Sequence, residues 1–230
     1  MVSAGAWPRA IFFDFDGVLA ESVALKEQAF RDLFADYGED IVEQVIELHR
    51  ASGAISRVIK IERIHRELLG TPLSQAELAD WAERYVAAVE ARVVACPEVT
   101  GTTDLLDTQA ARARLFVVSG TPEEELQRIV TARGWDRYFD GVYGSPRLKA
   151  EIVRTALSEF RLAAADCVFI GDTFTDRDAA VETGLAFVGR RVHFRPNPFP
   201  PGTRIVDDMA ELADVLAAAE ADGLMPEAAA

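Results

Sequence analysis

Two carboxylates stand one residue apart at the end of an apolar segment near the start of the chain. The stretch IFFDFDGVLAES (11–22) contains Asp14 and Asp16, and Gly17 follows directly. On a continuing strand the two acids would share one face, where like charges repel each other. We therefore expect the chain to turn immediately after Asp14, or a cation to compensate the pair, or both.

Polar residues follow two later apolar segments in the same way. Ser119 and Gly120 end one segment, whereas Asp172 and Asp176 follow another, and Lys149 opens a helical stretch. In an open parallel sheet, ligands bind at the carboxyl ends of the strands, near the point where the strand order reverses. Several acids at one edge are costly unless a divalent cation or a proton intervenes. Oxygen ligands with open coordination positions suit Mg²⁺, which takes few carboxylates, keeps several waters and also binds a substrate phosphate.

Five short apolar segments, rich in Val, Ile and Phe, predict the buried strands that would position these residues: AIFFDF, LFVVSG, FDGVYG, DCVFIGD and LAFVG. Helical patterns at 121–134, 146–160 and 175–184 lie between the later segments. In the first pattern, Thr121 is the expected N-cap and Pro122 the first helical residue. This alternation predicts an α/β fold with a Rossmann-like, doubly wound parallel sheet and right-handed crossovers.

The stretch after the first segment breaks the alternation and contains only helical patterns. They cover 22–37, 39–51, 55–69 and 74–92, separated by Gly38, Gly53 and a GTPLS turn. We predict a helical cap domain over residues 21–93, inserted into an α/β core formed by 1–20 and 94–230. After residue 190 we expect a proline-rich surface loop, a short strand near RIV and a last helix at 208–219.

The motifs DFDGVLAES, VVSGT, SPRLKAE (with Lys149) and GDTFTD resemble, in this order, the four motifs of the haloacid dehalogenase-like hydrolase superfamily. The resemblance spans residues 10 to about 190 and is to the branch with a helical cap after the first motif. Each motif alone also fits a plain structural role: turn acids, a strand-to-helix turn, a surface lysine, or an acid at a helix start. Their order and their places at strand ends favour the family.

The resemblance implies that Asp14 is a nucleophile and that Asp16 is the general acid/base, whose backbone carbonyl also binds the metal. A carboxylate attacks a phosphate dianion poorly because like charges repel, so Mg²⁺ and Lys149 would neutralise that repulsion. Family members that cleave carbon–halogen or carbon–phosphorus bonds lack the second acid. Because this chain has Asp16, the resemblance implies that it is a phosphatase or a phosphomutase.

The resemblance assigns the remaining core residues to the phosphoryl group and the cofactor. Ser119 would donate a hydrogen bond to the transferring phosphoryl group, helped by the Gly120 amide, and Lys149 would screen its charge. Asp172 would bind Mg²⁺, and Asp176 would hold a metal-bound water or Lys149. The metal ligands implied in this way are Asp14, Asp16, Asp172 and Asp176.

The loop SGAISRVIK (52–60) between two cap helices is the candidate for substrate recognition. Its Arg57 resembles an arginine in the cap loop of β-phosphoglucomutase-like proteins that meets an anionic or hydroxylated group, and Lys60 is a second candidate. Both also fit as solvated charges at an exposed helix start. We expect His49 and His65 to be surface residues.

These features together predict a Mg²⁺-dependent phosphatase for a small phosphate monoester, such as a sugar phosphate or a phosphoglycolate-like metabolite, acting through a phosphoaspartyl intermediate. A β-phosphoglucomutase-like phosphomutase is the alternative. A non-catalytic phosphate-binding module is a third hypothesis, disfavoured because nucleophile and acid are both present.

The composition narrows the range of partners. The 230 residues are 50% hydrophobic and carry a formal net charge of −14 without any Lys/Arg cluster, which argues against nucleic acid. No apolar run approaches the ~20 residues that span a bilayer, and the N-terminal stretch lacks the apolar core of a signal peptide. We expect a cytoplasmic protein with reduced, buried Cys96 and Cys167. A monomer and a homodimer both remain open.

Overall fold

A computed structural model describes residues 8–52 and 55–222, so Gly53, one of the expected separators, lies outside the described residues. Six parallel strands form one sheet in the order β3-β2-β1-β4-β5-β6. The strands are β1 (Ala10–Phe13), β2 (Arg114–Pro122), β3 (Gly141–Ser145), β4 (Cys167–Gly171), β5 (Ala186–Arg190) and β6 (Ile205–Val206). The predicted doubly wound α/β fold is confirmed.

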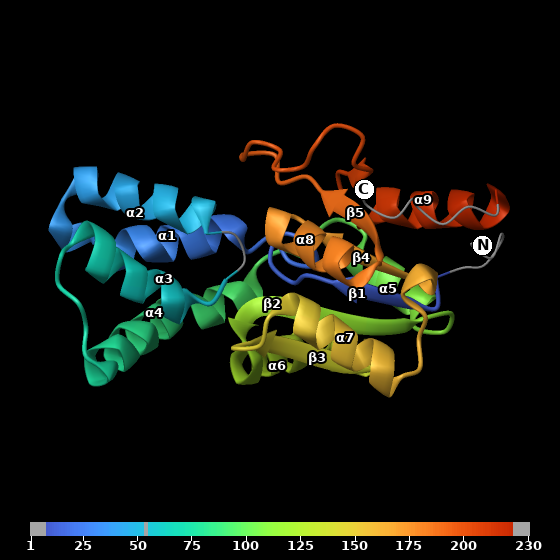
Figure 1. Cartoon of the computed structure of the whole chain (residues 1–230), viewed down its shortest axis with the longest axis horizontal. Coiled ribbons are helices and arrows are strands. Elements are labelled where there is room, and N and C mark those ends of the chain that lie inside the picture. The colour runs from blue at the N-terminus through green and yellow to red at the C-terminus, as the bar shows by residue number, and fades with distance from the viewer. Residues whose placement is uncertain (1–7, 53–54, 223–230) are drawn as a thin grey trace.

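β1 is the centre of the sheet because its sequence is apolar on both faces. All four of its residues are buried, as expected for a strand covered by helices on both sides. Phe12 stacks on Phe116 of β2 with ring centroids 4.8 Å apart. The helices α7 (Lys149–Glu159) and α8 (Phe174–Thr183) cover this face. Ile11 and Phe13 point to the other face, which α5 (Thr102–Gln109), α6 (Glu123–Ala132) and α9 (Met209–Asp222) cover (Figure 1).

Two details of the core differ from the sequence-based expectation. α5 was not predicted, because TTDLLDTQ has too few apolar residues to show a helical period. The helix α6 begins at Glu123 rather than Pro122, and β2 extends through Thr121 to Pro122. The prediction of Thr121 as an N-cap was therefore wrong.

The segment after β1 is helical, as predicted. It contains α1 (Val23–Leu33), a 3₁₀ turn (Ala35–Tyr37), α2 (Glu39–Ala51), α3 (Arg57–Arg63), a π-helical turn (Ile64–Leu68) and α4 (Gln75–Ala95). Figure 1 shows these helices gathered at one end of the molecule, beside the sheet. We call this helical bundle the insert.

The prediction that His49 and His65 lie on the surface was wrong. Their exposed fractions are 9% and 2%. The His49 ring packs on Phe30 with centroids 4.7 Å apart, and His65 packs on Trp81 at 4.6 Å. An imidazole can fill a place in an aromatic cluster, and helical periodicity alone did not distinguish the two histidines from surface polar residues.

The strand order reverses between β1 and β4, because the chain builds β2 and β3 on one side of β1 and β4 to β6 on the other. Crevices at such a reversal are the usual ligand sites of open α/β sheets. The insert leaves the sheet at the carboxyl end of β1, so it stands beside this crevice. Within the described part of the chain, no helix combines the length and the apolar character needed to cross a membrane.

Candidate active site

Asp14 follows β1 directly and continues the sheet by one hydrogen bond. Its backbone N–H donates to the carbonyl of Ile170 at 2.9 Å. The chain then turns at Gly17, whose φ is +77°, and a Cβ at this position would lie 2.7 Å from Asp172 Oδ2. The expected turn is present, and glycine is needed both for the left-handed backbone and for the approach of the Asp172 carboxylate.

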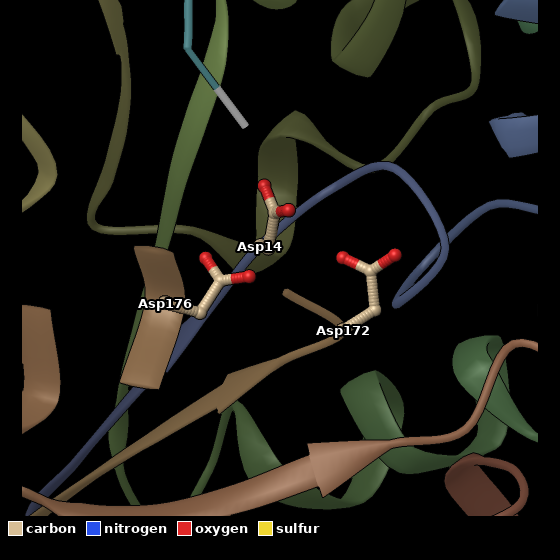
Figure 2. A group of neighbouring side chains, drawn as sticks. All are labelled: Asp14, Asp172 and Asp176. Carbon is tan, nitrogen blue, oxygen red and sulfur yellow. The ribbon is translucent and has the colours of Figure 1, made fainter. Parts of the chain in front are cut away.

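Three buried carboxylates meet at the crevice. One oxygen each from Asp14, Asp172 and Asp176 lies within 4.8 Å of the others, and Figure 2 shows the three carboxylates directed to the same side. Asp172 Oδ1 is buried without a hydrogen-bond partner among the residues that the structure describes. A buried carboxylate oxygen without a partner is costly, and a bound cation would satisfy it.

Lys149 at the start of α7 compensates two of these acids. Its Nζ lies 3.0 Å from Asp14 Oδ1 and donates a hydrogen bond to Asp176 Oδ1. The other oxygen of Asp176 accepts from the backbone N–H and the hydroxyl of Thr173, at 3.0 and 2.7 Å. Both Asp176 oxygens are thus engaged. This arrangement fits a residue that holds Lys149 better than a direct metal ligand.

The electrostatics of the group show a shortage of positive charge. Burial, followed by repulsion from Asp176 and Asp16, raises the pKa of Asp14 from 3.8 to about 7, although Lys149 lowers it. Burial and the charge of Asp14 raise the pKa of Asp172 well above its ordinary value. Burial alone would lower the pKa of Lys149, but Asp14 and Asp176 outweigh that effect and raise it.

Asp16 lies outside this group of three acids and pairs with a different lysine. Lys26 of α1 donates to Asp16 Oδ2 at 2.5 Å, Ser22 donates to Oδ1 at 2.6 Å, and the Thr121 hydroxyl lies 3.2 Å from Oδ2. Burial raises the pKa of Asp16, but the Lys26 charge and these hydrogen bonds outweigh it, and the pKa is lowered. The carboxylate of Asp16 is therefore no member of the buried acid group.

Sequence analysis missed Lys26 and the hydroxyl of Thr121. The spacing of four between Ser22 and Lys26 places both on one face of α1, and that signal could have identified Lys26. The nearness of Thr121 to Asp16 depends on the pairing of distant strands, which the sequence does not display.

A cleft opens above these residues, between the carboxyl edge of the sheet and the insert. Asp14, Asp16 and Asp172 form its floor together with Ser119 and Gly120. Ser119 is 2% exposed, and its Oγ accepts a hydrogen bond from the Thr121 N–H at 3.1 Å. The cleft thus brings together Asp14, Asp16, Asp172, Ser119 and Gly120, which the sequence analysis singled out. Lys149 and Asp176 do not line the cleft, and Lys149 pairs with Asp14 and Asp176.

Arg57 and Lys60 of α3 line the same cleft from the insert side. Their exposed fractions are 8% and 5%, so the alternative interpretation as solvated charges at an exposed helix start is wrong. Arg57 forms an ion pair with Glu125 at the start of α6. Lys60 Nζ donates to the His49 carbonyl at 3.3 Å. The pairing with Glu125 was not foreseen and leaves Arg57 less free to meet a substrate than expected.

Comparisons with known proteins agree with this architecture. A family model described as haloacid dehalogenase-like hydrolase matches residues 8–184. Protein CbbY of Cereibacter sphaeroides is 29% identical over 218 residues, which cover 88% of this chain and 93% of that protein. A phosphoglycolate phosphatase of Pseudomonas fluorescens is 25% identical over 236 residues, covering 98% of this chain and 86% of that protein.

Solved structures show the same fold. CbbY from Rhodobacter sphaeroides in complex with phosphate superposes with a TM-score of 0.72 at 23% identity, covering 89% of this chain and 96% of that one. A variant of the same protein in complex with xylulose-1,5-bisphosphate gives a TM-score of 0.72 at 22% identity, with the same coverage.

Proposed function

The chain belongs to the haloacid dehalogenase-like hydrolase family, and from this premise we propose that it is a Mg²⁺-dependent phosphatase that hydrolyses a small phosphate monoester through a phosphoaspartyl intermediate on Asp14. The observation that carries the proposal is a buried group in which Asp14 and Asp172 line the floor of one cleft and Lys149 pairs with Asp14. An acid group of this kind without a cation is electrostatically unfavourable, and bound Mg²⁺ would relieve it and would also attract a phosphate ester.

The residues present fit Mg²⁺. Asp14 and Asp172 offer carboxylate oxygens in a buried group, and Asp172 Oδ1 has no other partner among the described residues. We propose Asp172 as the main ligand, because its Oδ1 has no other partner among the described residues. Asp14 and the backbone carbonyl of Asp16 are the further ligands that we propose. Mg²⁺ bound there would supply the positive charge that phosphoryl transfer requires. We propose that Asp176, whose oxygens are occupied, acts on the site through Lys149.

In the first step, a carboxylate oxygen of Asp14 forms a bond to phosphorus as the bond from phosphorus to the ester oxygen breaks. Lys149 at 3.0 Å keeps Asp14 in place and balances its charge. Ser119 and the Gly120 amide, at the end of β2 in the same cleft, are placed to donate hydrogen bonds to the phosphoryl oxygens. Donors fixed in advance stabilise the charge of the transition state.

Asp16 serves as proton carrier in both steps. It gives a proton to the departing ester oxygen and later takes one from the water that attacks the phosphoaspartyl group, which releases phosphate and restores Asp14. A placed acid/base contributes about 10²–10⁴-fold to a rate. In the structure Asp16 is held by Lys26, Ser22 and Thr121, an arrangement that favours its ionised form and hence the second step.

The substrate class follows from the cleft and the relatives. A cleft lined by buried side chains between the sheet and the insert suits a small metabolite rather than a macromolecule. Relatives named for phosphoglycolate and a CbbY structure with xylulose-1,5-bisphosphate support a small phosphorylated acid or sugar. We propose further that residues 21–93 act as a cap whose closure excludes bulk water during the first step.

A screen of phosphorylated metabolites tests the proposal. Purified protein is incubated with each ester with Mg²⁺ or with EDTA, and released phosphate is measured beside any isomeric sugar phosphate. We expect release of phosphate from a subset of esters only with Mg²⁺, and none from the Asp14→Asn variant. Conversion of one sugar phosphate into its isomer without net release would instead identify a phosphomutase.

A further inference from the structure

The proline-rich loop after β5 reaches across to the insert. Arg195 in this loop donates from Nε to Glu27 Oε1 of α1 at 2.7 Å, and its Nη2 also donates to that oxygen. Glu27 is buried, with a side-chain exposure of 8%. The contact joins positions that are 168 residues apart in the chain. It draws the Arg195 guanidinium to the wall of the cleft whose floor holds Asp14 and Asp172.

Glu27 does not neutralise this wall. Arg50 of α2 also binds it, from Nη2 to Oε2 at 2.8 Å and from Nε to Oε1 at 3.2 Å. One carboxylate is therefore shared by two guanidinium groups, and the cluster carries one net positive charge. Arg195 is the member that lines the cleft, with a side-chain exposure of 18%, whereas Arg50 is 46% exposed. The excess charge thus faces the space that a substrate enters.

Lys60 of the insert adds a second cation to the same wall. It is 5% exposed and lines the cleft with Arg195. Burial, then the charges of Lys26 and Arg195, lower its pKa to about 7. Arg195, which lines the same cleft, is thus close enough to Lys60 for its charge to act on that amine. Holding a buried cation near a second, partly buried one is costly in a protein, and an anion between them would relieve the repulsion.

We propose that Arg195 and Lys60 form a subsite for a second negatively charged group on the leaving-group side of the substrate, a carboxylate or a second phosphate. This assignment rests on the proposed function for the position of the transferred phosphoryl group over Asp14. It makes the loop after β5, and not the insert alone, a determinant of specificity. A guanidinium suits both anions because it donates two parallel hydrogen bonds.

Matched ligand pairs test the subsite by binding alone. The Asp14→Asn variant with Mg²⁺ is titrated by calorimetry with 3-phosphoglycerate and with glycerol 3-phosphate, which differ only in a carboxylate. A second arm compares fructose 1,6-bisphosphate with fructose 1-phosphate, which differ in a phosphate. We expect at least one ligand with the second anionic group to bind tenfold or more tightly than its partner without that group, and the arm that responds identifies the anion. Equal affinity within both pairs would overturn the proposal.

The variants then locate the effect. Adding Arg195→Gln to the Asp14→Asn protein should reduce the preference about tenfold or more, and Arg195→Lys should restore part of it. Arg191→Gln is the matched control, because Arg191 lies in the same loop but pairs with Asp207 at the surface. A preference that survives Arg195→Gln unchanged, or falls equally with Arg191→Gln, would contradict the assignment. If the Asp14→Asn protein shows the binding preference but the unmodified protein with Mg²⁺ hydrolyses no ester, the proposed function is refuted and the subsite stands.

Discussion

Arg57 and Glu125 form an ion pair that is buried between the insert and the core. The two side chains are 8% and 5% exposed. Arg57 begins α3, and Glu125 lies in the first turn of α6. The guanidinium also lies over the Tyr85 ring, 5.0 Å from its centroid. The pair therefore ties α3 of the insert to α6 of the core, which gives Arg57 a structural role beside any contact with a substrate.

Arg57→Ala should destabilise the protein strongly, because it leaves the Glu125 carboxylate buried without its counterion. Removing one partner of a buried pair costs about 3–5 kcal/mol. The double variant Arg57→Ala/Glu125→Ala should lose much less than the sum of the single losses. Urea unfolding of the four proteins measures this coupling. The exposed pair Arg128–Glu90 is the control, where the coupling should stay below about 1 kcal/mol. Equal coupling energies for the Arg57–Glu125 and Arg128–Glu90 pairs would contradict a stabilising role for the buried ion pair.

Lys26→Met should change how activity depends on pH. Without the Lys26 charge and hydrogen bond, only the hydrogen bonds from Ser22 and Thr121 oppose the effect of burial on Asp16, so the pKa of this carboxyl rises. If release of phosphate needs ionised Asp16, the acidic limb of the kcat profile moves to higher pH. Lys26→Arg keeps the charge and should leave the limb near its original position. An unmoved limb in Lys26→Met would show that Asp16 does not govern it.

Metal removal should make stability fall as pH rises from about 4 to 7. The pKa of Asp14 rises from 3.8 to about 7 on folding, and that of Asp172 rises as well, both first through burial. In that window the folded protein without metal holds protons that the unfolded chain releases, so the free energy of unfolding decreases with pH. Mg²⁺ should oppose this loss, and its stabilising effect should grow with pH.

Thermal unfolding with EDTA and with Mg²⁺ across this range measures the effect. Asp172→Asn removes one of the two shifted carboxyls, so its EDTA curve should depend less on pH and its response to Mg²⁺ should shrink. A response to Mg²⁺ that is equal in both proteins would place the ion elsewhere.

The sequence predicts the sheet well, because buried parallel strands such as AIFF and CVFIG are short apolar runs that end in polar residues. It also places Asp14, Asp172 and Lys149 at strand and helix ends, where topology brings them together. The side chains that it misses are partners of distant segments. Arg57 meets Glu125 across 68 positions and Lys26 meets Thr121 across 95. Such contacts depend on how the insert packs against the core, and no local sequence pattern specifies this packing.

The central claim is that Asp14 carries the phosphoryl group, and rapid acid quench tests it most directly. Protein is mixed with Mg²⁺ and a ³²P-labelled ester from the substrate screen, quenched within one turnover and digested. We predict acid-stable, hydroxylamine-labile label on the peptide that contains Asp14. Asp178→Asn, which changes an exposed acid of α8, should label normally, and folded Asp14→Asn should not label. Phosphate release during that turnover without label on Asp14, or turnover by folded Asp14→Asn, would contradict the account.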